Sequence, residues 1–201
     1  MYLSTRSPTL SLDLPEDIVL HVTPEQFERL AAANRDLKLE RTSAGELIVN
    51  PPTGGESGKR NLSITGQLSI WYEAHEELGE AFDSSTGFIL PNGANRSPDA
   101  AWLNRARWQS LTPKQQKSFV PLCPDFVVEL RSESDSLVKL QAKMQEYIDN
   151  GARLGWSIDP QTRRVEIYRP GGAVEVLENP IELSGEDVLP GFVLNLRRVL
   201  N

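Results

Sequence analysis

A short strand-like segment in the middle of the chain carries acidic residues where a buried strand is expected to be apolar. Residues 125–130 read Asp-Phe-Val-Val-Glu-Leu. Side chains alternate between the two faces of a strand, so Asp125, Val127 and Glu129 share one face. Burying a carboxylate without a partner is costly, so Glu129 requires a cation, a metal ion or water in the folded protein. The fold must therefore bring a compensating group to this strand.

The residues after this strand predict a helix and three further strands. Residues 132–136 supply several N-cap side chains, and the dipeptide Asn150-Gly151 is typical of a helix end. The strand-like segments that follow, each bounded by turn residues, cover residues 154–159, 164–169 and 173–178.

The N-terminal half predicts two helices and two hairpins. Thr23-Pro24-Glu25-Gln26 provides a capping box for a helix that ends near Asn34. Apolar residues at helical spacing predict a second helix over residues 58–78, which Gly79 closes. The predicted hairpins pair residues 37–41 with 46–50, and residues 87–90 with 99–103. This mixture indicates an α/β or α+β domain in which helices pack a mixed sheet.

Length and composition limit the class of protein. The 201 residues fit one domain, expected over residues 23–201 behind a loose arm at residues 1–22. The formal net charge of −7 excludes a surface that coats nucleic acid nonspecifically. One Cys and two His residues exclude a zinc site of thiolate and imidazole ligands, so a metal would need oxygen ligands. Without a signal-peptide pattern or a long apolar run, we expect a cytoplasmic protein and no membrane span.

One stretch reverses the sign of the overall charge. Residues 104–124 contain Arg105, Arg107, Lys114 and Lys117 and no acidic residue, a local charge of +4. Such a contrast is expected of a surface that faces phosphate groups. We therefore expect any DNA contact to be local and to involve this basic segment.

A second carboxylate, Asp99, begins another predicted strand. Two carboxylates from neighbouring strands can hold a hard cation, and an ammonium group beside them can orient water or stabilise charge. On the predicted helix, Lys143 lies about 60° from the apolar Leu140 and borders the buried face, whereas Lys139 points further toward solvent. Together with Glu129, these residues have the parts that metal-assisted phosphodiester hydrolysis requires.

Each of these residues also has a purely structural explanation. Glu129 could form a salt bridge with Arg131 or lie at an exposed strand end. Asp99 could be a turn residue after Pro98, and Lys143 an ordinary lysine whose stem packs while its ammonium reaches solvent. The residue pattern leaves both interpretations open.

Several motifs in a fixed order carry a resemblance to a known family. They are Ser97-Pro98-Asp99-Ala100-Ala101-Trp102, then Cys123-Pro124-Asp125-Phe126-Val127-Val128-Glu129-Leu130-Arg131-Ser132, then Lys143-Met144-Gln145-Glu146-Tyr147 through Asn150-Gly151-Ala152 and Trp156-Ser157-Ile158-Asp159-Pro160. Over roughly residues 36–198 the chain resembles the Uma-two family of predicted restriction endonucleases, in the PD-(D/E)XK nuclease-like superfamily.

The resemblance implies a fold and a site. The fold is α/β, with a restriction-endonuclease-like core in which helices flank a mixed central β-sheet, and with added β-hairpins. The site would use Mg²⁺ or Mn²⁺, with Asp99 and Glu129 as metal ligands. Lys143 resembles the family's lysine moved onto the following helix, and Glu56 resembles an acidic residue that supports such sites.

The chain departs from the superfamily pattern at Arg131, which stands where the lysine after Glu129 would be. Either Lys143 substitutes or the site is weakened. Because Arg is always protonated, we expect Arg131 to bind phosphate or to pair with Asp125. Glu56 also fits a carboxylate favoured by the dipole at a helix N-terminus.

Two functional hypotheses follow. The first is a magnesium-dependent DNA endonuclease that hydrolyses phosphodiester bonds. The second is a nuclease-like fold without turnover that binds nucleic acid or protein, since a fold does not by itself imply an activity. Strands predicted near the C-terminus could pair between copies, which leaves a homodimer open.

Overall fold

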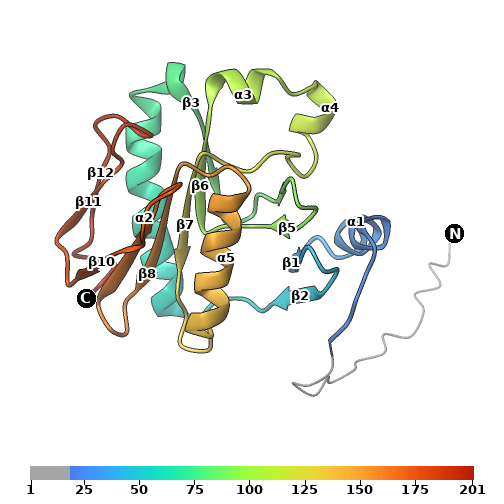
Figure 1. Ribbon diagram of the computed structural model, residues 1–201, viewed down its shortest axis with the longest axis horizontal. Helices are drawn as coiled ribbons and strands as arrows, with labels where there is room; N and C mark the ends of the chain where they lie inside the picture. The colour runs from blue at the N-terminus through green and yellow to red at the C-terminus, as the bar shows by residue number, and fades with distance from the viewer. Residues whose placement is uncertain (1–18) are drawn as a thin grey trace, which may run out of the picture.

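The computed structural model describes residues 19–201 and shows a sheet with a long helix on each side (Figure 1). Of the arm predicted over residues 1–22, residues 1–18 lie outside the described residues. Val22 donates its backbone N–H to the Gly45 oxygen at 2.8 Å, and Leu47 donates to the Leu20 oxygen at 2.7 Å. Residues 20–22 are therefore attached to the domain.

A six-stranded mixed sheet forms the centre of the protein. Its strands are β3 (Gly79–Asp83), β6 (Ala100–Asn104), β7 (Phe126–Leu130), β8 (Leu154–Asp159), β9 (Arg164–Tyr168) and β10 (Glu175–Glu178). The order is β10-β9-β8-β7-β6-β3, and β7 and β8 are parallel while the other pairs are antiparallel. A parallel pair needs a long crossover, which the helix between β7 and β8 supplies. The predicted mixed α/β class is confirmed.

Two helices cover opposite faces of this sheet (Figure 1). Helix α2 (Gly55–Glu73) lies on the face that carries Phe126 and Val128, and α5 (Leu137–Asp149) lies on the face that carries Val127. The buried contacts are made by Ile64, Leu68 and Trp71 of α2 and by Met144, Tyr147 and Ile148 of α5. The alternation of side chains predicted for β7 is confirmed. Glu129 therefore shares the α5 face with Val127.

A smaller sheet is built from two hairpins. Its strands are β1 (Lys38–Arg41), β2 (Leu47–Asn50), β4 (Phe88–Ile89) and β5 (Asn95–Arg96), in the order β2-β1-β5-β4. The first predicted hairpin, β1–β2, is confirmed. The second is wrong in one strand, because β4 pairs with β5 while residues 100–104 pair with β3 and β7. The two residues of β5 are polar and give no apolar strand signal.

Helix α2 differs from its prediction at both ends. It begins at Gly55 and ends at Glu73, and Leu78 lies in a 3₁₀ turn, η1 (Glu76–Leu78). Gly79 begins β3 rather than closing the helix. The remaining elements are α1 (Pro24–Ala33), α3 (Arg105–Gln109), α4 (Pro113–Gln116), β11 (Glu182–Ser184) and β12 (Val193–Asn195). Among residues 19–201, no helix has the length and apolar character needed to cross a membrane.

A close approach at Gly79 allows a test of this packing. A Cβ atom there would lie 2.3 Å from the Leu103 carbonyl oxygen and 2.6 Å from the Trp102 indole. We expect Gly79→Ala to lower the free energy of unfolding by about 1–3 kcal/mol, because backbone or a buried ring must move. Gly66→Ala in α2 is the control, since its Cβ meets no atom within 4 Å, and it should be neutral or stabilising. Urea unfolding measures both, and equal stabilities would contradict the prediction.

Candidate active site

The register of the central sheet places Asp99 beside Glu129. Ala100 pairs with Val128 across β6 and β7, and the Asp99 N–H donates to the Val128 carbonyl oxygen at 2.9 Å. Asp99 lies in a bend just before β6, and its Oδ2 accepts the N–H of Leu130, the residue after Glu129. Its negative charge contributes to the raised pKa of Glu129. The two predicted metal-binding carboxylates therefore lie close together at the β6–β7 pair.

These carboxylates begin a polar row that crosses the sheet beneath α5. Glu129 pairs with Ser157 of β8, and Ser157 pairs with Glu166 of β9. Glu166 accepts hydrogen bonds from the side-chain amide of Gln141 at 2.8 Å and from the Tyr168 hydroxyl at 2.7 Å. The β9 end of the row is thus hydrogen-bonded by neutral donors, with Arg164 Nη2 at 3.7 Å from Glu166 Oε1, whereas the β6–β7 end is in direct contact with a lysine ammonium.

Helix α5 delivers an ammonium group to Glu129. Lys143 Nζ lies 2.7 Å from Glu129 Oε1 and 2.9 Å from Glu40 Oε1. The Lys143 side chain is 16% exposed, whereas Lys139 is exposed, so the inward orientation predicted for Lys143 is confirmed. Glu129 is buried, which excludes the alternative of an exposed strand end.

Arg131 lies outside this cluster. Its guanidinium donates to Asp159 Oδ2 at 2.7 Å, and Asp125 pairs with Arg107 at 2.8 Å. The expected pairings of Arg131 with Glu129 or with Asp125 are therefore wrong. The parallel register of β7 and β8 explains the outcome, because it sets the residue after β7 beside the last residue of β8.

Glu40 of β1 is a site residue that the sequence interpretation missed. Its Oε1 accepts hydrogen bonds from Lys143 and from the Ser97 backbone N–H at 3.0 Å, and its Oε2 lies 3.3 Å from Arg96 Nη1. The side chain is 3% exposed. This carboxylate therefore connects the small sheet to α5 and to the peptide that leads into β6.

The two oxygens of Asp99 have different surroundings. Oδ2 accepts the backbone N–H of Leu130 at 2.8 Å, which fixes the carboxylate against β7. Oδ1 lies 3.4 Å from Lys38 Nζ, which is long for a charge-assisted hydrogen bond. Asp99 therefore has one oxygen held firmly and one held weakly.

Further polar groups support the cluster. Tyr147, fully buried, donates its hydroxyl to Glu129 Oε1 at 2.9 Å. Arg96 donates Nε to Glu146 Oε2 at 2.6 Å while its Nη1 faces Glu40. These bonds give the buried carboxylates hydrogen-bond partners, without which they would destabilise the fold.

The charges in the cluster depend on one another. Burial raises the pKa of Glu129 against the attraction of Lys143, and the carboxylates of Asp99 and Glu40 raise it further. Burial also opposes ionisation of Glu40, but Lys143 and Arg96 together hold the pKa of Glu40 below its ordinary value. Burial opposes the charge on Lys143 as well, yet Glu129 and Glu40 keep its pKa above the ordinary value. Lys143 is therefore an ammonium group at neutral pH and not a proton acceptor.

Asp99 and Glu129 suit a magnesium site made of two carboxylates. Mg²⁺ usually binds proteins through one or two carboxylates and keeps several waters. Among the residues that the structure describes, no three His, Cys, Asp or Glu side chains are arranged to cage a metal ion. Neighbouring negative charge contributes to the raised pKa of Glu129, a repulsion that a divalent cation would relieve. The oxygen donors fit a hard cation rather than zinc.

Glu56 lies apart from these residues. It is in the first turn of α2, the helix on the other face of the sheet, and its side chain is 67% exposed. It pairs with Lys59 at 3.0 Å and with Arg60 at 3.8 Å. The structure does not bring Glu56 to the carboxylate pair, and its contacts are those of an acid at a helix N-terminus.

The basic segment begins where β6 ends and α3 starts (Figure 1), whereas Asp99 precedes the first residue of β6. Arg105 and Arg107 are each paired with a carboxylate, at 2.6 and 2.8 Å. Their partners are Glu80 of β3 and Asp125, the residue before β7. Both lie outside the basic segment, so its own sequence does not predict these ion pairs. The positive charge that this surface can offer a phosphate is smaller than predicted.

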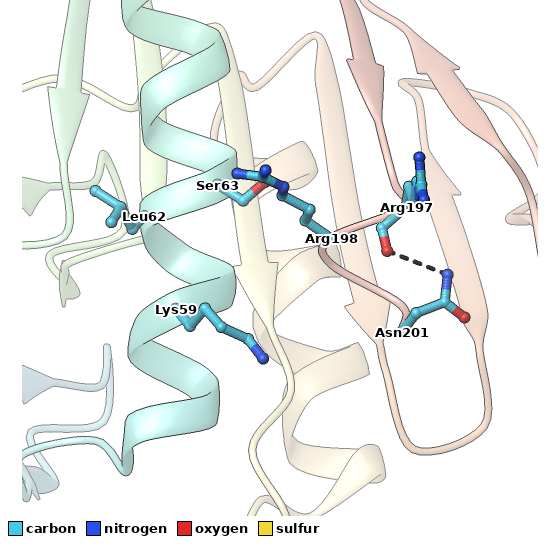
Figure 2. A pocket seen from close by; sticks show the side chains of 6 residues that line it. All are labelled: Lys59, Leu62, Ser63, Arg197, Arg198 and Asn201. Atoms are coloured by element: carbon cyan, nitrogen blue, oxygen red, sulfur yellow. Dashed lines mark hydrogen bonds between the residues drawn. The ribbon is translucent and has the colours of Figure 1, made fainter.

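A surface groove of about 620 Å³ runs along α2 and the C-terminal segment (Figure 2). Its lining residues are Lys59, Leu62, Ser63, Arg197, Arg198 and Asn201. No Asp or Glu side chain of the described residues lines this groove. Because it lacks metal ligands and lies along the helix opposite α5, the groove is separate from the candidate active site.

Comparison with known proteins agrees with this architecture. Residues 24–197 match the Uma2 family model, described as "Putative restriction endonuclease". A crystal structure of a "putative nuclease belonging to DUF820" from Anabaena variabilis ATCC 29413 matches with a TM-score of 0.73 at 18% identity, over 89% of this chain and 97% of that chain. A cryo-EM structure of a DrdV–DNA complex matches with a TM-score of 0.36 at 17% identity, over 61% of this chain and 10% of that one. No curated protein matches.

Removal of Lys143 tests the charge balance of the cluster. We expect Lys143→Met without metal to lower the free energy of unfolding by about 3 kcal/mol at neutral pH, because two buried carboxylates lose their shared cation. A carboxylate whose folded-state pKa is raised favours folding as the pH falls, so protonation of Glu129 should reduce this loss when the pH is lowered from neutral into the acidic range.

The matched control is Lys139→Met on the exposed side of the same helix, which should change stability by less than about 0.5 kcal/mol. Denaturant unfolding at neutral pH and at acidic pH measures the stability of the two variants. A loss for Lys143→Met that does not depend on pH would argue against the assigned charges.

Proposed function

Since this chain belongs to the Uma2 family, we propose that it is a metal-dependent endonuclease that hydrolyses phosphodiester bonds in DNA. The observation that carries this proposal is the pair of adjacent carboxylates, Asp99 and Glu129, with the Lys143 ammonium 2.7 Å from Glu129. Two acidic oxygen donors and one fixed cation are the groups that metal-assisted phosphoryl chemistry needs.

Asp99 and Glu129 would hold Mg²⁺ or Mn²⁺. When bound, such an ion lowers the pKa of a coordinated water and stabilises negative charge on phosphate oxygens. The protein's contribution is to fix the two carboxylates. The Leu130 N–H holds Asp99 against β7, and the Tyr147 hydroxyl holds Glu129.

Lys143 takes the place of the lysine that the motif would put at Arg131. Arg131 is engaged with Asp159, whereas the Lys143 ammonium is directed at Glu129. Because Lys143 stays protonated, its role is electrostatic: it orients the attacking water and stabilises charge as the phosphate is attacked.

Contact with DNA is proposed from the positive charge of the basic segment, residues 104–124, and not from the fold or from the net charge of the chain. In the basic segment, Lys114 and Lys117 make no ion pair within residues 19–201, and they are the cations of this stretch that suit a phosphate backbone. A cytoplasmic location and a homodimer stay predictions of the sequence.

Plasmid cleavage tests the proposal. We expect the protein to nick supercoiled DNA with Mg²⁺ or Mn²⁺, and Asp99→Asn or Glu129→Gln to lower the rate by at least about 100-fold, because losing a ligand removes several kcal/mol of charge stabilisation. Asp187→Asn, at an 84% exposed carboxylate paired with Arg153, is the matched control and should keep the wild-type rate. Full activity in Asp99→Asn would refute the site.

Two further outcomes separate the alternatives. We expect Glu56→Gln to keep most of the activity, because this side chain contacts Lys59 and Arg60 and not the carboxylate pair. A large loss would instead support the auxiliary role that the family resemblance implies. DNA binding by the wild type without cleavage in any divalent ion would favour a binding module over an enzyme.

A further inference from the structure

Lys38 is a cation at the site that the proposed mechanism does not use. It lies on β1, two residues before Glu40, so both side chains leave the strand on the same face. Within residues 19–201 its ammonium makes one ion pair, to Asp99 Oδ1 at 3.4 Å, and its side chain is 31% exposed. Among the two lysines of the site, Lys38 is therefore the more exposed and the more loosely held.

Lys143 is not free to contact a substrate. Its ammonium is shared by Glu129 and Glu40, both of which are buried. Moving it toward a phosphate would remove the closest cation from the buried Glu129 and leave the buried Glu40 with Arg96 alone, which is strongly unfavourable. A direct phosphate contact at this site has to come from another residue.

The surroundings of Asp99 show where Lys38 would act. Oδ2 is engaged by the Leu130 N–H, so Oδ1 is the oxygen that a divalent cation would take. Lys38 is the positive group beside Oδ1. A divalent cation would therefore compete with the Lys38 ammonium for Oδ1, and an ammonium displaced from Oδ1 would remain beside Asp99.

The strand beneath Lys38 is fixed while its side chain is long. β1 pairs with β2 over four residues, and Glu40 ties it to Ser97 and Lys143. Leu39 is buried on the other face of β1. Four flexible methylene groups then allow the ammonium to turn from Asp99 toward a neighbouring anion without movement of the backbone.

We propose that Lys38 neutralises Asp99 when no metal is bound and contacts the substrate phosphate when a metal is bound. This inference rests on the proposed nuclease function and names a further substrate-contacting residue for it. It predicts that loss of the Lys38 charge has opposite effects on two affinities: the divalent cation should bind more tightly and DNA more weakly.

Lys38→Met tests both affinities. Calorimetric titration with Ca²⁺ alone should show an affinity several-fold above wild type. Binding of a DNA duplex in Ca²⁺ should weaken by about eightfold at about 0.1 M salt, and the slope of log K against log salt should fall by about 0.9, the values for one lost phosphate contact. Lys38→Arg keeps the charge and should keep the salt slope. Lys139→Met is the control for loss of an exposed lysine.

Each outcome decides a separate point. If Lys38→Met weakens both affinities, the residue is structural and the inference is overturned. If DNA affinity and salt slope are unchanged, Lys38 does not contact phosphate. If the wild type neither binds the duplex in Ca²⁺ nor cleaves DNA in Mg²⁺, the proposed nuclease function fails, and the role of Lys38 fails with it.

Discussion

Two buried carboxylates, Glu129 and Glu40, share the ammonium group of Lys143. A protein interior tolerates such charges only when they are compensated and hydrogen-bonded. The three side chains come from the central sheet, the small sheet and α5, so this ion cluster holds three parts of the fold in a fixed relation. The carboxylate of Asp99 is positioned by the same arrangement, because Glu40 also accepts the N–H of Ser97, two residues before it.

Local periodicity was enough to predict the centre of the site. The face of β7 that carries Glu129 follows from alternation along a strand, and the inward side of Lys143 follows from its angle on a helix. Both are properties of one element. The proximity of Asp99 to Glu129 depends on how two strands pair, which local periodicity does not predict. The ordered motifs of the family resemblance supplied that expectation.

The rest of the site depends on contacts that no local pattern contains. Glu40 and Lys143 are 103 positions apart, and Glu40 was not singled out although it follows the buried Leu39 in a predicted strand. Within that strand Glu40 lies between Leu39 and Arg41 and on the same face as Lys38, which is the pattern of a strand with one polar, exposed face and did not indicate burial. The carboxylates that pair with Arg105 and Arg107 likewise belong to other parts of the chain. The net charge of residues 104–124 therefore overstated the positive charge of the surface that they form.

The order of the elements along the chain has a consequence for synthesis. A polypeptide that ends after β7 contains Glu40, Asp99 and Glu129 but not Lys143, which is added with α5. Such a fragment has the acidic groups of the cluster without the cation that Glu40 and Glu129 share. Under the proposed function, the charge balance of the site is therefore completed only when synthesis has passed α5.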